Sequence, residues 1–128
     1  MNYLILTAAI LALIAFIAHV TMGQKNYLKP IMESEIDAVP KKFVQSLFHY
    51  LTVFLLFSTI ILLAGSHSSC PLYAYVMHMV RFIAVVYGLF AVTSLVIALT
   101  SKINGGMLKL FQWILYTAIS TLAVFGSM

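Results

Sequence analysis

The residues in this sequence that could do chemistry are four histidines, one cysteine and one arginine. His19 and His49 are candidates for binding a cofactor, because neutral imidazole is the commonest nitrogen ligand of metals and also ligates haem iron. If they met inside the protein, they could be the axial ligands of a b-type haem or could bind a transition metal. In the alternative interpretation, each ring holds two helices together through a hydrogen bond to Gln24, Gln45 or a backbone carbonyl.

A second group of potential ligands lies between positions 67 and 78. His67, Cys70 and His78 combine two imidazoles with a thiol, and nearby methionines add the soft sulfur ligands that copper(I) favours. These three residues are therefore a candidate metal site. The alternative is a loop histidine beside a thiol that binds nothing. A single cysteine excludes an internal disulfide.

Arg81 is the only arginine and the only charged residue in the interior of an apolar stretch. A charge within the membrane is costly and usually functional, so Arg81 is a candidate for contacting a haem propionate, a lipid phosphate or a substrate carboxylate. No carboxylate lies in an apolar stretch to pair with it. The alternative is that its long side chain reaches the outer headgroups by snorkelling.

Membrane-spanning helices must position these residues. The 128 residues are 63% hydrophobic and 8% charged, whereas a soluble domain has roughly a quarter charged residues. The apolar stretches do not alternate with polar residues as barrel strands would. We expect an all-α polytopic membrane protein in which residues 1–128 form one domain, an antiparallel bundle of four transmembrane helices. The expected helices cover about 3–22, 43–65, 76–99 and 108–126.

The segment between the first two apolar stretches contains all three acidic residues. Its apolar residues recur at helical spacing, and Pro30 suits the first turn of a helix. We expect a short amphipathic helix on the cytoplasmic membrane face. The alternative is a solvated loop that only links two spans.

The lysines predict the orientation of the chain. They lie in the first and third connections, and the second connection has none. Because basic residues favour the cytoplasmic side, we expect a multi-pass protein of the bacterial inner membrane with both termini periplasmic.

Small and polar residues should face the interior of the bundle, since they allow close helix approach and interhelical hydrogen bonds. Such stripes contain Ala8, Ala12 and His19 in the first helix, and His49 and Thr52 in the second. At about 1.5 Å per residue, His19 lies about 24 Å along its helix from Tyr3, near the expected depth of His49. The two imidazoles are therefore expected to meet. The inward faces of the last two helices are expected to carry His78, Arg81, Val85 and Gly88, and Trp113, Tyr116, Thr117 and Ser120.

The first half of the chain contains His19-x-x-x-Gly23, Leu28-Lys29-Pro30, Pro40 and the pair Phe48-His49. These features resemble a group of small bacterial four-helix inner-membrane proteins of unknown function. In that group a histidine closes the first helix and an aromatic-histidine pair opens the second, where Phe48 replaces the more usual tryptophan. The resemblance implies a four-helix membrane architecture and a shared site around His19 and His49, but no reaction.

Three functional hypotheses follow from the sequence. The preferred one is a small membrane protein without its own catalysis, which associates with itself or with a larger membrane complex. The second is a haem- or metal-binding bundle for electron transfer or sensing, which uses His19 and His49 and also Arg81. The third is a permease for a small solute. The sequence has no phosphate loop, HExxH motif or Ser-His-Asp set, and we expect no nucleic-acid partner.

Overall fold

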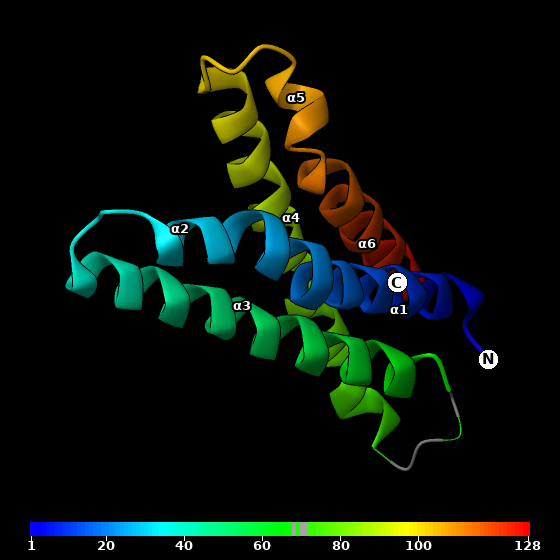
Figure 1. Cartoon of the computed structure of the whole chain (residues 1–128). Coiled ribbons are helices and arrows are strands. Elements are labelled where there is room, and N and C mark those ends of the chain that lie inside the picture. The colour runs from blue at the N-terminus through cyan, green and yellow to red at the C-terminus, as the bar shows by residue number, and fades with distance from the viewer. Residues whose placement is uncertain (68, 70–71) are drawn as a thin grey trace.

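A computed structural model describes residues 1–67, 69 and 72–128, and no strand occurs among them. The chain folds into two helical hairpins that are joined near the termini (Figure 1). The first hairpin pairs a long N-terminal helix with α3, and the second pairs α4 with α5 and α6. The elements are α1 (Tyr3–Ala18), the π-helix η1 (His19–Leu28), α2 (Lys29–Glu33), α3 (Ala38–Gly65), α4 (Tyr73–Thr100), α5 (Gly106–Lys109) and α6 (Gln112–Gly126).

The first three elements form one continuous helix of 31 residues. The backbone becomes extended at Ser34, whose hydroxyl donates to the carbonyl of Ile31 at 2.6 Å. The chain then turns back into α3, which runs beside the N-terminal helix (Figure 1). The expectation of a separate amphipathic helix in this segment was therefore wrong, because the segment continues the first helix. Pro30 is the second residue of α2, but α2 continues η1 without a break, so Pro30 lies inside the long helix and not in a first turn as expected.

Within the described part of the chain, three helices are long and apolar enough to cross a membrane, which indicates a membrane protein. α3 and α4 each contain 28 residues and extend the expected ranges toward the N-terminus. The expected helix 108–126 is instead interrupted around Leu110 and Phe111. The 15 residues of α6 rise about 22 Å, less than the roughly 30 Å hydrocarbon thickness of a bilayer. Four full transmembrane helices are thus not observed.

The indole of Trp113 bridges the interruption between α5 and α6. Its Nε1 donates to the carbonyl of Met107 at 3.2 Å. This bond satisfies a carbonyl near the end of α5 that receives no backbone N–H from a continuing helix. The two short helices therefore stay connected although the backbone between them is not helical.

The core lies where the two hairpins meet. Ala8, Ala9 and Ala12 are fully buried, and their small size lets the neighbouring helices approach α1 closely. The hydroxyl groups of Ser58 and Tyr87 are 2.9 Å apart and connect α3 to α4. The other core residues include Ile5, Leu55, Leu62, Val80, Ile83, Ala84, Ile119 and Ala123.

Asn2 joins three chain segments at this end of the molecule, which we call the joined end. Its side-chain oxygen accepts from the amide of Ile5 at 3.2 Å and caps α1. Its side-chain amide donates to the carbonyl of Gly126 at 2.6 Å, and its backbone amide donates to that of Ser66 at 2.8 Å. The ends of α3 and α6 are thereby held beside the start of α1.

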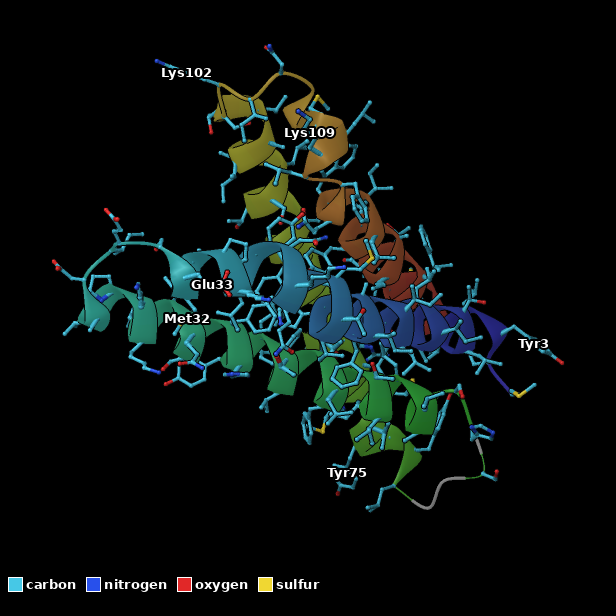
Figure 2. The ribbon with its side chains drawn as sticks, in the orientation of Figure 1. Tyr3, Met32, Glu33, Tyr75, Lys102 and Lys109 are labelled. Atoms are coloured by element: carbon cyan, nitrogen blue, oxygen red, sulfur yellow. The ribbon has the colours of Figure 1, made fainter. Side chains whose placement is uncertain are left out.

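The hairpins diverge away from the joined end (Figure 1). Figure 2 shows Met32 and Glu33 toward the tip of the first hairpin, and Lys102 and Lys109 at the tip of the second. We call this side the open end. The divergence separates α3 from α4 and leaves space between the hairpins, which contains the candidate site.

Candidate functional site

His19 bridges η1 to α3. Its Nε2 lies 3.1 Å from the carbonyl oxygen of Phe48 and 3.1 Å from the hydroxyl oxygen of Thr52. The Thr52 hydroxyl itself donates to the Phe48 carbonyl at 3.0 Å. Because a carbonyl only accepts, this geometry assigns the proton of a neutral ring to Nε2 and leaves Nδ1 as the acceptor. His19 thus makes a helix-bridging hydrogen bond to a backbone carbonyl.

His49 does not share this environment. Its side chain is exposed, so the expectation that both imidazoles point into one interior was wrong for His49. The ring of Phe48 stacks on His19 with centroids 3.9 Å apart and meets His49 edge-on at 5.8 Å. In this arrangement the aromatic partner of His19 is Phe48, and the two histidines do not face each other across an open haem pocket.

A ligand at His19 would have to use Nδ1 or displace the bonds at Nε2. A Cβ atom at Gly23 would lie 3.6 Å from Nδ1 and 3.4 Å from the Phe48 ring. The absence of a side chain at Gly23 therefore leaves room beside this nitrogen. Gly23 lies directly against the stacked His19 and Phe48 rings, and a Cβ there would meet them at ordinary van der Waals distances.

The proposed ligand set near the second connection is only partly described, because Cys70 lies outside the described residues. His67 is exposed, and its Nδ1 lies 3.0 Å from the Ser66 hydroxyl and 3.2 Å from the Leu63 carbonyl. His78 is exposed on α4. Within residues 1–67, 69 and 72–128, no cluster of three or more His, Cys, Asp or Glu side chains could hold a metal.

Arg81 contacts the C-terminal end of the last helix. Its Nε and Nη2 donate to the carbonyl of Ser127 at 3.1 and 2.7 Å. Carbonyls at a helix C-terminus lack partners within the helix, and a cation there is favoured by the helix dipole. The partner of Arg81 is thus a backbone carbonyl and not a carboxylate, and a backbone partner cannot be identified from residue types. The contact joins α4 to α6.

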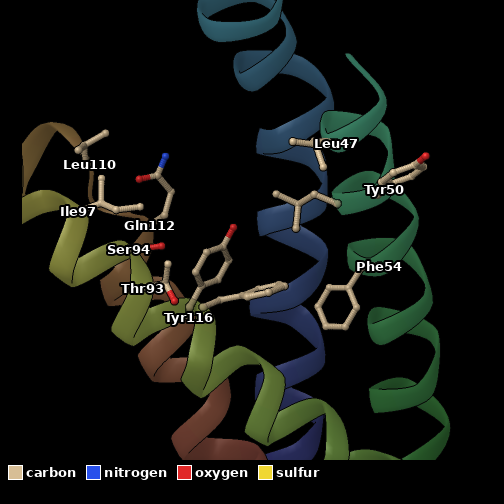
Figure 3. A pocket seen from close by; sticks show the side chains of 11 residues that line it. Leu47, Tyr50, Phe54, Thr93, Ser94, Ile97, Leu110, Gln112 and Tyr116 are labelled. Carbon is tan, nitrogen blue, oxygen red and sulfur yellow. The ribbon is translucent and has the colours of Figure 1, made fainter. Parts of the chain in front are cut away.

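A cleft with a volume of about 610 Å³ lies between the hairpins on the side of α3 and α4 (Figure 3). Its walls are largely apolar, and aromatic rings line its inner part. Phe54, Tyr87, Phe90 and Tyr116 form a cluster with ring centroids 5.3 to 6.4 Å apart. The cleft is lined by Leu47, Tyr50, Leu51, Phe54, Phe90, Thr93, Ser94, Ile97, Leu110, Gln112 and Tyr116.

Five polar side chains of the cleft have no hydrogen bond to any described residue: Tyr50, Thr93, Ser94, Gln112 and Tyr116. Two other threonine hydroxyls on the same helices are satisfied locally. Thr100 and Thr117 donate to carbonyls four residues earlier, at 2.8 and 2.7 Å. Since a polar group without a partner is unfavourable in an apolar environment, the cleft contains unused hydrogen-bonding capacity.

His19 belongs to a smaller compartment next to this cleft. The compartment has a volume of about 150 Å³ and shares Leu51, Gln112 and Tyr116 with the cleft. Its other walls include His19 and Gly23. The space between the hairpins is therefore bounded by α3 and α4 in the cleft and by η1 in the smaller compartment.

Sequence reasoning found part of this site. It placed Tyr116 on an inward face, and this residue lines the cleft. It did not identify Thr93, Ser94 or Gln112. Thr93 and Ser94 could have been identified as a polar pair within a long apolar stretch, because polar residues in such stretches tend to face other helices.

Comparisons with protein-family models, curated proteins and solved structures found no match.

Proposed function

We propose that this chain is a small integral membrane protein without catalysis of its own, which associates through the cleft with a transmembrane helix. That helix belongs to a second copy of the chain or to a larger membrane complex. The supporting observation is the group of five polar side chains without hydrogen bonds in an apolar cleft. In lipid, such groups hydrogen-bond across helix interfaces and contribute to association.

The alanine stripe of α1 is less suited to this association. Ala8 and Ala12 are fully buried by helices of the same chain. They therefore offer no free surface for a partner. The cleft differs because its walls are separated, and a helix entering between the diverging hairpins would meet both apolar side chains and hydrogen-bonding groups.

We also propose a bacterial inner-membrane location with both termini periplasmic. The basic residues at the open end support this orientation through the positive-inside preference. They are Lys25, Lys29, Lys41 and Lys42 in the first hairpin, and Lys102 and Lys109 in the second. Arg81 is instead near the joined end, where it contacts Ser127.

Self-association can be measured by energy transfer between donor- and acceptor-labelled copies in phosphatidylcholine liposomes. We expect transfer that rises with the protein-to-lipid ratio. Interhelical hydrogen bonds contribute about 0.6 to 2 kcal/mol, so Thr93→Val should weaken association at least about threefold. Thr117→Val is the matched control, because its hydroxyl is bonded within its own helix. It should leave association unchanged.

Other outcomes identify a different partner or reject the proposal. Equal effects of Thr93→Val and Thr117→Val would exclude the cleft as the interface. If labelled copies show no transfer, a photo-crosslinker at position 93 in native membranes should link the chain to another membrane protein. If neither energy transfer nor a crosslink from position 93 is observed, the proposal of helix association through the cleft is wrong. A lipophilic small molecule that copurifies with the wild type and is lost in Gln112→Leu would replace the helix as the occupant.

Haem or metal binding is the second candidate, supported by the acceptor Nδ1 of His19 beside Gly23. A Soret band or stoichiometric metal that disappears in His19→Ala would support this function. Colourless protein with background metal would leave His19 as a bridge between η1 and α3.

A further inference from the structure

A separate cavity lies between the first long helix and α3. It has a volume of about 440 Å³ and shares no residue with the cleft. Most of its wall comes from one face of η1 and α2, and one residue comes from α3. The lining residues are Thr21, Gln24, Lys25, Leu28, Lys29, Met32 and Gln45. We call this cavity the lysine groove.

The lysine groove is positively charged. Lys25 and Lys29 line it, and no carboxylate does. Lys29 lies 3.7 Å from Glu33, but both side chains are 67% exposed, so this pair is weak and leaves the lysine available. Lys25 has no ion pair within the described part of the chain. The groove therefore presents two cations to a ligand.

Amide groups add hydrogen-bond donors to these charges. The ammonium group of Lys42 donates to Oε1 of Gln45 at 3.0 Å. This bond occupies the acceptor oxygen of Gln45 and leaves its NH₂ group as a donor. Gln24 contributes a second side-chain amide to the wall. Ammonium and amide donors around one cavity match the acceptor oxygens of a phosphate group.

The position along the helix identifies the source of that phosphate. Thr21 is 18 residues beyond Tyr3, or about 27 Å, which is close to the hydrocarbon thickness of a bilayer. In a helix that spans from Tyr3, the lysine groove thus lies at headgroup level. Leu28 and Met32 give it an apolar wall, and Ile14 and Ile17, which precede the groove on the same long helix, are half exposed.

From this geometry we infer that the lysine groove binds the headgroup of an anionic phospholipid. Lys25 and Lys29 neutralise the phosphate, and the amides of Gln24 and Gln45 donate hydrogen bonds to its oxygens. The acyl chains extend along the exposed apolar side chains of α1. The inference requires a membrane-embedded chain but not a partner in the cleft.

The test is native mass spectrometry of the full chain in detergent, titrated with phosphatidylglycerol or phosphatidylcholine. We expect preferential binding of phosphatidylglycerol. Because a basic residue near an anionic lipid contributes about 1 kcal/mol, Lys25→Gln/Lys29→Gln should weaken this binding about tenfold or more. Lys25→Arg/Lys29→Arg should retain it. Circular dichroism checks that each variant keeps its helical content.

The matched control is Lys102→Gln/Lys109→Gln, which removes the same charge from the tip of the second hairpin (Figure 2). It should change phosphatidylglycerol affinity less than twofold. An equal loss in both double variants would overturn the inference, because it would show general attraction to a basic surface. Equal binding of the two lipids would also overturn it. Competition by millimolar inorganic phosphate would identify a free-phosphate site and reject the lipid assignment.

Helix association through the cleft and lipid binding in the lysine groove can be tested independently. Thr93→Val should leave phosphatidylglycerol binding unchanged, because position 93 does not line the lysine groove. Lys25→Gln/Lys29→Gln should leave energy transfer in phosphatidylcholine liposomes unchanged. A negative result in one assay therefore does not determine the other.

Discussion

The joined end and the open end of the molecule use polar groups in opposite ways. At the joined end, Asn2 and Arg81 each hydrogen-bond to a residue distant in the sequence. At the open end, Gln112 and Tyr116 face a cleft without such partners. The difference indicates that one end of the protein holds the fold together, while the other is available for binding.

Side-chain size accounts for this difference. Alanines fill the interface at the joined end, whereas the aromatic cluster lies where the hairpins begin to diverge. Small side chains allow close helix approach, and large rings keep the helix axes farther apart. The change from alanine to aromatic residues along the hairpins therefore positions the cleft.

The largest effect on the free energy of unfolding is expected from a substitution in the alanine interface of α1. Ala8→Leu adds three carbons at a fully buried position and should reduce the free energy of unfolding by about 1 to 3 kcal/mol. Ala64→Leu is the matched control, because Ala64 is exposed. Unfolding by SDS in mixed micelles provides the measurement. Similar losses in both variants would contradict the view that the joined end carries the stability.

A smaller effect is expected at Arg81. Arg81→Gln removes the charge and the paired donation to Ser127, and should reduce the free energy of unfolding by about 0.5 to 1 kcal/mol, since the side chain is exposed. Arg81→Lys should retain part of this contribution. Hydrogen exchange should become faster at the C-terminal end of α6. If exchange changes only in α4, the contact does not secure the last helix.

The smallest effect on stability is expected in the cleft. Tyr116→Phe removes a hydroxyl without a hydrogen bond to any described residue, so the free energy of unfolding should change by less than about 0.5 kcal/mol. The same SDS titration as for Ala8→Leu allows direct comparison. A loss above about 1 kcal/mol would show that this hydroxyl stabilises the isolated chain, and the two ends would then not differ as described.

Helix type and approximate spans were predictable from the sequence because long apolar runs leave few alternatives in a membrane. The end of α3 at Gly65 and the burial of Ala8 and Ala12 matched the predictions. The continuation of the first helix through residue 33 was not predicted, since its lysines and acids resemble a connecting segment.

The candidate site was harder to predict because it depends on the angle between hairpins. His19 was correctly chosen as an interhelical residue, but its partners are Phe48 and Thr52 and not His49. A one-residue difference in helix phase decides which side chain of the pair Phe48-His49 faces η1. The helical periodicity of the sequence defines an inward face about 100° wide. It does not decide which of two adjacent residues at the edge of that face points inward.

The short α6 has a consequence for the surrounding lipid. Its length of about 22 Å contrasts with about 42 Å for its neighbour α4, so one flank of the molecule suits a thinner bilayer than the other. Such hydrophobic mismatch costs a fraction of a kcal/mol per ångström and is relieved by local thinning. The protein should therefore deform its membrane asymmetrically, and a change of bilayer thickness should tilt it.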